Sequence, residues 1–185
     1  MIVRCSWANG IDIYEKYHDE EWGKPEFDSI KLFEKICLEG QQAGLAWITI
    51  LKKRENYRKA FYQFNPELIV NMTDQDIDKL MLDKGLIRHR IKLEAIVKNA
   101  KAYMAMQKCG ENFSNFIWSF VNNQPQINDV PTLNSIPTKT ETSKLLSKAL
   151  KKRGFVFVGE ITCYAFMQSM GLVNDHINDC FCKNK

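Results

Sequence analysis

Residues 36–47, ICLEGQQAGLAW, connect two stretches that we predict to be helices, and they contain an unusual carboxylate. The first predicted helix has an apolar side that includes Phe33, so Glu39 stands beside a hydrophobic face, where burying a charge is costly. Gly44 suits a turn, and Trp47 begins the apolar face of the next predicted helix. The stretch therefore predicts a helix–turn–helix unit whose carboxylate needs an explanation.

Helical periodicity continues along the rest of the chain. Apolar residues recur at three- and four-residue spacing most clearly between residues 88 and 108. Thr73 and Asp76 form a capping-box pattern before another apolar face, and the repeated prolines of residues 122–138 predict a connecting loop. Alternating strand patterns are nearly absent. We therefore predict an all-α fold of many short helices, forming one domain over residues 1–185 that could be divided into two helical lobes.

The composition excludes several classes of protein. The 185 residues are 45% hydrophobic and 26% charged, and no apolar run approaches the ~20 residues that span a membrane. The N-terminus lacks the pattern of a secretion signal, so we expect a cytoplasmic protein. A net charge of +4 permits nucleic-acid binding without requiring it.

Cysteine and histidine residues near the two chain ends predict a metal site. A cytoplasmic location disfavours disulfides. His176 and Cys180 are four residues apart, which would place them on one face of a helix, and Cys5 with His18 supplies a second pair. Two cysteines and two histidines are a common ligand set for structural zinc. We therefore predict one zinc ion that joins the ends, with Cys182 as a less suitable alternative to Cys180; unrelated surface residues are the other interpretation.

Two kinds of basic segment are candidates for DNA contact. Residues 83–96, DKGLIRHRIKLEAI, resemble a helix–hairpin–helix element, in which a glycine turn presents backbone N–H groups to a phosphate. Only Gly85 is present where two glycines are usual, so an ordinary helical hairpin is the better interpretation of this segment alone. The clusters at 52–54 and 151–153 are consistent with phosphate contacts or with solvated helix faces.

Several longer blocks together resemble one enzyme family. They are HDEEWG (18–23), LEGQQAGLAWITILKKRENYR (38–58), GLIRHR (85–90), WSFVN (118–122), SKALKKRGFVFVG (147–159) and GLVNDH (171–176). In this order and without a large insertion, they resemble the 3-methyladenine DNA glycosylase I family of the helix–hairpin–helix glycosylase superfamily. The resemblance implies an all-helical, monomeric base-excision enzyme. Such an enzyme removes 3-methyladenine from alkylated double-stranded DNA, releases the free base and leaves an abasic site.

The resemblance also assigns roles to individual residues. It implies a base pocket containing the catalytic Glu39, a wedge that enters the DNA stack, and a zinc clasp. The pocket maps onto Glu39, Tyr17 and Trp47 with Trp7, Tyr14 and Trp22 as neighbours, the wedge onto Gly44 and Leu45, and the zinc ligands onto Cys5, His18, His176 and Cys180. The chain departs from the family at Ser6, Ala46 and Glu160.

Each of these roles has a structural alternative. Glu39 could be a carboxylate favoured by a helix N-terminus, Trp47 and Leu45 could be core residues, and Tyr17 could be a surface ring. No counterpart of the superfamily's catalytic aspartate is found, so the resemblance leaves the activation of water open. The alternative function is a non-catalytic, zinc-stapled module that binds damaged DNA; a protein-interaction scaffold is a third.

Overall fold

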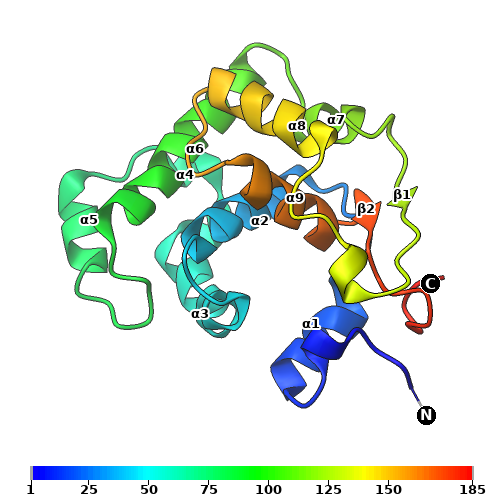
Figure 1. The fold of residues 1–185 in the computed structure, drawn as a ribbon. Coiled ribbons are helices and arrows are strands. Elements are labelled where there is room, and N and C mark those ends of the chain that lie inside the picture. The colour runs from blue at the N-terminus through cyan, green and yellow to red at the C-terminus, as the bar shows by residue number, and fades with distance from the viewer. Residues whose placement is uncertain (1, 185) are drawn as a thin grey trace.

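The computed structural model describes residues 2–184, and most of its ordered elements are helices (Figure 1). The described residues also contain one parallel pair of strands, each two residues long, which the sequence did not predict. The elements are α1 (Asp12–Glu20), α2 (Ser29–Gln42), α3 (Trp47–Ala60), α4 (Pro66–Ile69), α5 (Asp74–Leu80), α6 (Arg90–Lys108), α7 (Phe113–Ser119), β1 (Gln126–Ile127), α8 (Glu141–Lys152), α9 (Glu160–Ser169) and β2 (Val173–Asn174), with short 3₁₀ turns at Ser6–Ala8, Tyr62–Phe64 and Leu133–Ser135.

Local capping chemistry explains where the helices begin and end. The side chain of Asp28 accepts hydrogen bonds from two backbone N–H groups in the first turn of α2. The predicted capping box of Thr73 and Asp76 starts α5. Helix α6 starts at Arg90, two residues later than the expected segment 88–108, because the His89 side chain caps it. These contacts confirm the predominantly helical prediction.

Helix α2 runs through the centre of the molecule and packs against α3, α6, α7 and α9. Its residues Phe33, Ile36 and Cys37 are buried in the main hydrophobic core, together with much of α6. Because α2 is covered over most of its length, its charged residues Lys35 and Glu39 lie in the interior. None of the helices formed by residues 2–184 has the length and apolar character needed to cross a membrane.

The two ends of the chain lie side by side (Figure 1). The backbone N–H of Phe181 donates to the carbonyl of Val3 at 3.0 Å, and that of Ile177 donates to Cys5 Sγ at 3.5 Å. The side chains around this junction form a second hydrophobic cluster, distinct from the main core, that contains Cys5, Tyr17, Trp22, Leu51, Cys180 and Cys182. The two chain ends are therefore in direct contact, as the predicted metal site requires.

Gly171, which follows α9, supports a testable prediction about this arrangement. Its φ is +71°, and a Cβ atom there would overlap the backbone of Lys24 and Pro25. We expect Gly171→Ala to lower the free energy of unfolding by about 3 kcal/mol or more, since it adds a backbone overlap to an unfavourable φ.

Gly110→Ala is the matched control, because Gly110 has a φ of +80° and no heavy atom within 4 Å of the position that a Cβ would take. It should cost only about 1–2 kcal/mol. Urea titration of both variants measures the difference, and equal losses would contradict the role of close packing at Gly171.

Candidate active site

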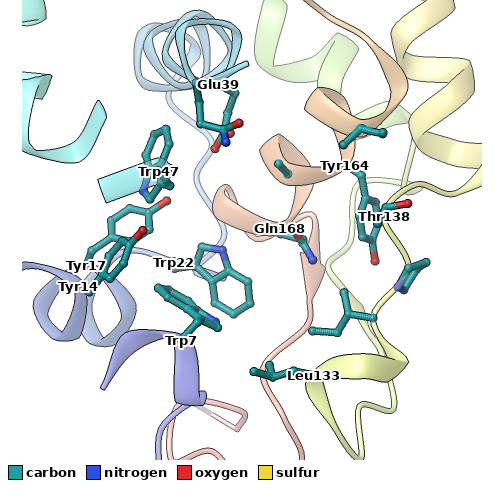
Figure 2. Close-up of a pocket in the computed structure, with 15 residues that line it drawn as sticks. Trp7, Tyr14, Tyr17, Trp22, Glu39, Trp47, Leu133, Thr138, Tyr164 and Gln168 are labelled. Carbon is teal, nitrogen blue, oxygen red and sulfur yellow. The ribbon is translucent and has the colours of Figure 1, made fainter. Parts of the chain in front are cut away.

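A cavity of about 530 Å³ opens between the N-terminal region with α2 and α3 on one side and α9 with the loop that precedes α8 (Glu141–Lys152) on the other (Figure 2). Every residue predicted for the base pocket lines this cavity. They are Trp7, Tyr14, Tyr17, Trp22, Glu39 and Trp47. The six residues predicted from separate parts of the sequence therefore surround the same cavity.

Aromatic rings form one side of the cavity. Trp7 lies edge-on to both Tyr14 and Trp22, with ring centroids 5.6 and 5.2 Å apart. The rings of Tyr17 and Trp47 are 5.7 Å apart with their planes at 42°. Tyr17 is buried, which excludes the surface-ring alternative. Such a wall can stack on a planar ligand.

Trp47 carries an unusual polar feature. Its indole Nε1 is buried and has no hydrogen-bond partner. Among residues 2–184, no other side-chain nitrogen or oxygen is found in this state. A buried N–H group without an acceptor is costly, and the indole can only donate. Because Trp47 lines the cavity, a ligand with an acceptor atom at this position would remove that cost. Plain core packing does not account for Trp47.

Glu39 lies in the last turns of α2, with 5% of its surface exposed. Glu39 is thus not in the first turn of a helix, which the alternative explanation by a helix dipole requires. Burial raises the pKa of Glu39 to about 7, although the charge of Lys35 and the hydroxyl of Ser169 both act to lower it. A carboxyl group with this pKa changes its charge near neutral pH, as functional carboxyls often do.

Lys35 is a component of the site that the sequence-based predictions missed. It is 3% exposed, and its Nζ donates a hydrogen bond to Tyr17 Oη at 3.1 Å. The ammonium lies 4.7 Å from the ring centroid of Tyr17 and 4.8 Å from that of Trp47. Burial lowers the pKa of Lys35 to about 8. The available signal was a lysine one helical turn before Glu39, within an otherwise apolar face.

The opposite side of the cavity was also missed. Tyr164 and Gln168 line it from α9, and both side chains donate to Asp175 Oδ2, at 2.6 and 2.9 Å. Asn128 donates to the other oxygen of this buried carboxylate at 2.7 Å. The loop residues 133 and 136–138 complete this side (Figure 2). The side chains are held by contacts between segments far apart in sequence.

Glu160, for which the sequence offered no explanation, lies at the start of α9 beside this side of the cavity. It pairs with Lys139, with Nζ and Oε1 2.7 Å apart, and its neighbour Ile161 lines the cavity. An acidic residue is also favoured in the first turn of a helix. Glu160 therefore links the lining loop to α9 at the surface.

The predicted wedge lies in the turn between α2 and α3, directly after Gln42, which lines the cavity. Gly44 is exposed with a φ of +78°, and Leu45 is half-buried against the main core. The buried Lys92 donates to the carbonyl of Ala43 at 2.6 Å and so fixes the end of α2. The contact with Lys92 thus supports this turn at the rim of the cavity.

The predicted hairpin at residues 83–96 is fastened to α3. Asn56 donates to the carbonyl of Gly85 at 3.3 Å, and the backbone N–H of Ile87 donates to the hydroxyl of Tyr57 at 3.2 Å. Lys53 donates to the carbonyl of Lys84 at 2.7 Å. The glycine turn therefore has a fixed position on the surface.

The two basic clusters contain structural arginines. Arg54 makes a bidentate pair with Glu21 at 2.6 and 2.8 Å. Arg153 pairs with Glu111 at 2.7 Å and lies 4.2 Å from the ring centroid of Phe116. The lysines of these clusters other than Lys53 are exposed. In each cluster the arginine therefore makes structural contacts, whereas the exposed lysines are solvated.

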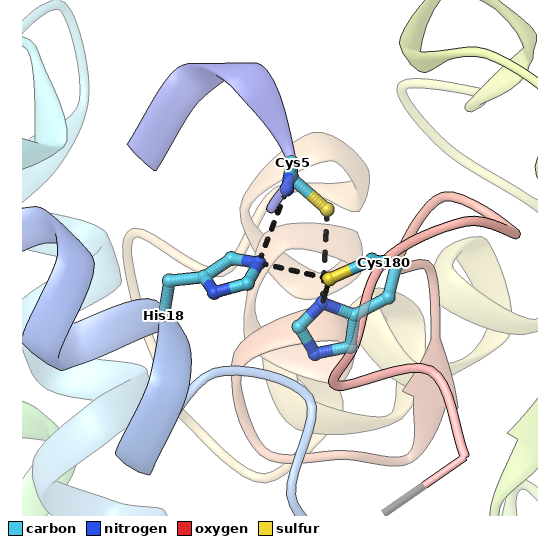
Figure 3. A group of neighbouring side chains, drawn as sticks. Cys5, His18 and Cys180 are labelled. Carbon is cyan, nitrogen blue, oxygen red and sulfur yellow. Dashed lines mark hydrogen bonds between the residues drawn. The ribbon is translucent and has the colours of Figure 1, made fainter. Parts of the chain in front are cut away.

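Four side chains from the two chain ends meet in a buried cluster (Figure 3). The ligand atoms of Cys5, His18, His176 and Cys180 all lie within 4.8 Å of one another. Cys180 Sγ is 3.5 Å from His18 Nε2 and from His176 Nδ1, and Cys5 Sγ is 3.6 Å from His176 Nδ1. Ideal zinc–sulfur and zinc–nitrogen distances of about 2.3 and 2.0 Å place sulfur and nitrogen about 3.5 Å apart in a tetrahedron. The cluster fits a tetrahedral metal ion.

The outer nitrogens of both histidines are already bound. His18 Nδ1 lies 2.8 Å from Asp19 Oδ1, and His176 Nε2 lies 3.1 Å from the carbonyl of Trp22. Such contacts fix the ring orientation of metal-binding histidines. Burial lowers the pKa of His176 to about 4, so its ring is neutral and able to act as a ligand.

One premise of the metal prediction was wrong. Residues 175–180 form a loop and a turn, not a helix, so His176 and Cys180 approach each other without helical spacing. The argument against Cys182 therefore loses its basis in helix geometry. Cys182 lies in a different group, with His18 and Asp19, whereas Cys180 completes the set of two cysteines and two histidines. The structure favours Cys180 for this reason.

Comparison with known proteins gives consistent matches over nearly the whole chain. Residues 7–183 match the family model described as methyladenine glycosylase. The chain is 74% identical over 183 residues to the DNA-3-methyladenine glycosylase of Haemophilus influenzae, with 99% of each chain covered. Its structure is similar to a crystal structure of 3-methyladenine DNA glycosylase I, with a TM-score of 0.96, 58% identity and coverage of 97% and 99% of the two chains. A variant of 3-methyladenine DNA glycosylase I in complex with 3-methyladenine gives a TM-score of 0.95 at 42% identity, over 98% of each chain.

Proposed function

The chain belongs to the methyladenine glycosylase family, and from this premise we propose that it hydrolyses the N-glycosidic bond of 3-methyladenine in alkylated double-stranded DNA. The observation that carries the proposal is the cavity in which the buried Glu39 lies beside an aromatic wall. The similar variant bound to 3-methyladenine supports the choice of base. We propose that residues 1–185 act as one monomeric glycosylase domain of helix–hairpin–helix type in the cytoplasm.

The reaction explains why a site without an evident water-activating group suffices. Methylation at N3 puts a positive charge on the base and weakens its bond to the sugar. When the bond breaks, its electron pair passes to the base, which leaves as neutral 3-methyladenine. Water adds to the sugar carbon and loses a proton to solvent, which produces an abasic site. The enzyme mainly has to extract and hold an activated leaving group.

The residues around the cavity are suited to a flipped base. Base flipping costs a few kcal/mol, and less for a damaged base. Gly44 and Leu45 would fill the gap in the stack, as wedge residues do in other DNA-binding proteins. Trp47 would stack on the purine, which contributes ~1–3 kcal/mol, with an added cation–π attraction. Its unpartnered Nε1–H supports an additional contact with a ligand acceptor.

Glu39 and Tyr17 would read the edge of the base. The carboxylate of Glu39 accepts hydrogen bonds, so it suits the exocyclic amine of a cationic adenine, and charge-assisted hydrogen bonds are roughly twice as strong as neutral ones. Tyr17 adds a directional contact. Neutral adenine lacks both the charge and the weakened bond, so the enzyme should be narrow, with 3-methylguanine as a second candidate substrate.

We also propose that Cys5, His18, His176 and Cys180 hold one structural zinc ion. The support is the match between their separations and a tetrahedral site, together with the fixed outer nitrogens of both histidines. The ion would supply the charge that keeps the cysteines as thiolates. The two histidines would then hold neighbouring residues in place around the cavity. His18 directly follows Tyr17, and His176 contacts the carbonyl of Trp22.

A non-catalytic module that binds damaged DNA is the second candidate, since the wedge and hairpin alone would serve it. The two functions differ in one measurement. Duplex DNA treated with a methylating agent is incubated with zinc-replete protein, and the freed bases are separated and identified. Release of 3-methyladenine is expected. Tight DNA binding without release of any base would support the binding module instead.

Glu39→Gln should lower kcat/KM for base release about 10- to 100-fold, because it keeps the shape of the side chain but removes a charge-assisted interaction worth about 1.5–3 kcal/mol. The measurement is base release under conditions of limiting substrate. Glu20→Gln, an equal change of charge at an exposed position on α1, should leave the rate unchanged. Equal effects of the two changes would assign the loss to net charge.

The activity should also fall as the pH decreases through about 7, because Glu39 then takes up a proton. The charge of the substrate is set by methylation and does not titrate in this range, so this acid limb belongs to the protein. A pH profile of kcat/KM measures it. Glu39→Gln should lack the limb, and a variant that retained it would exclude Glu39 as its source.

Removal of a zinc ligand should open the junction between the chain ends. We expect one zinc per chain by elemental analysis of protein purified without chelator. Cys180→Ser should lose the metal and lower Tm by several degrees, since metal binding contributes to folding. Cys182→Ser, at a neighbouring buried cysteine, is the control and should retain zinc. Loss of zinc only from the Cys182 variant would reverse the assignment.

A further inference from the structure

We propose that Lys35 is a positioning residue for base excision: its buried ammonium holds Glu39 in the carboxylate form and orients the Tyr17 hydroxyl toward the base. The inference rests on the proposed function, because it concerns the same cavity. Neither the family resemblance nor the sequence pattern assigned any role to this lysine.

The placement of Lys35 is costly and specific. A lysine side chain is almost never fully buried without partners, yet Lys35 is 3% exposed in the covered part of α2. It does not line the cavity but lies behind it, within cation–π distance of both Tyr17 and Trp47. Both rings do line the cavity. The ammonium is therefore separated from a bound base by the aromatic wall.

This position excludes one alternative role. A lysine with a lowered pKa can act as a nucleophile that forms a Schiff base with an abasic sugar. The Nζ of Lys35 instead donates to Tyr17 Oη and is shielded by the rings. Lys35 is also not among the residues that line the cavity. Lys35 therefore acts through other residues.

The direction of the hydrogen bond to Tyr17 is unambiguous. An ammonium group has donors and no acceptor, so Lys35 donates and the oxygen of Tyr17 accepts, at 3.1 Å. The hydroxyl proton of Tyr17 then points to an acceptor elsewhere, either a ring nitrogen of the base or the nearby Ser169. Lys35 thus leaves the hydroxyl proton of Tyr17 available for a hydrogen bond to the base.

The charge of Lys35 acts on Glu39, one turn later on α2. In a poorly solvated interior, opposite charges one helical turn apart favour each other's ionised forms. The charge of Lys35 accordingly lowers the pKa of Glu39, and that of Glu39 raises the pKa of Lys35, against the effect of burial. The other charged groups that act on Lys35 are Glu34 on α2, Glu21 after α1 and Arg54 on α3. Arg54 and Glu21 neutralise each other in a bidentate pair, which leaves Glu39 as the main partner.

The test compares pH profiles of Lys35→Met, which removes charge and donor, and Lys35→Gln, which keeps a donor without charge. Single-turnover base release from methylated duplex DNA is measured from pH 6 to 9, with the uncatalysed release subtracted. We expect the acid limb of both variants to move upward by about one pH unit, so that activity near pH 6.5 falls about tenfold. In Lys35→Gln the loss should shrink toward pH 9, because Glu39 is then largely ionised even without the lysine charge.

Two controls separate this role from a structural one. Lys31→Met removes an exposed lysine one turn earlier on the same helix and should not move the limb. Lys35→Gln should be faster than Lys35→Met at every pH, because it can still donate to Tyr17. A reduction by the same factor at all pH values, or an unmoved limb in both variants, would overturn the proposal.

A second measurement does not depend on catalysis. The carboxyl resonance of Glu39 in ¹³C-labelled protein, assigned with Glu39→Gln, reports its pKa directly. This pKa should be higher in Lys35→Met than in the parent, and an unchanged value would overturn the electrostatic part of the inference. If the parent released no base, the proposed function would fail, while this titration would still test the link between Lys35 and Glu39.

Discussion

The arrangement of the aromatic wall depends on the contact between the two chain ends. Cys5 precedes Trp7 by two residues, His18 directly follows Tyr17, and His176 contacts the carbonyl of Trp22. Tyr17 and Trp22 belong to a small hydrophobic cluster beside the main core, and Trp7 packs against it. The four cysteine and histidine side chains that meet there therefore lie next to the residues that form the aromatic wall.

The other half of the site takes its rigidity from the main core. Helix α2 is packed on several sides, and this packing forces Glu39 and Lys35 into surroundings that water reaches poorly. Burial raises the pKa of Glu39 and lowers that of Lys35, so both groups change charge closer to neutral pH than they would in water. On an exposed helix the same residues would form an ordinary surface pair worth little.

The features that could be predicted from the sequence are those set by local interactions. The cap at Asp28 and the capping box at Thr73 are predictable because their partners lie within one turn. The helix expected at His176 is absent because its backbone bonds to distant groups, with the N–H of Asn178 donating to the carbonyl of Val130 at 2.9 Å. Lys35 and the Asp175 network were missed for the same reason, since tertiary contacts alone give them their surroundings.

The pairing of Lys35 with Glu39 bears on how a site can bind a cation and still promote its departure. A carboxylate alone would bind the methylated base most strongly while it is charged, and that attraction would be lost as the bond breaks and the base becomes neutral. Binding that favours the ground state does not accelerate the reaction. Behind the aromatic wall, the ammonium of Lys35 offsets part of this attraction and leaves the hydrogen bonds of Glu39 and Tyr17 in place. A site of this kind recognises the pattern of donors and acceptors on the base without holding its charge too tightly.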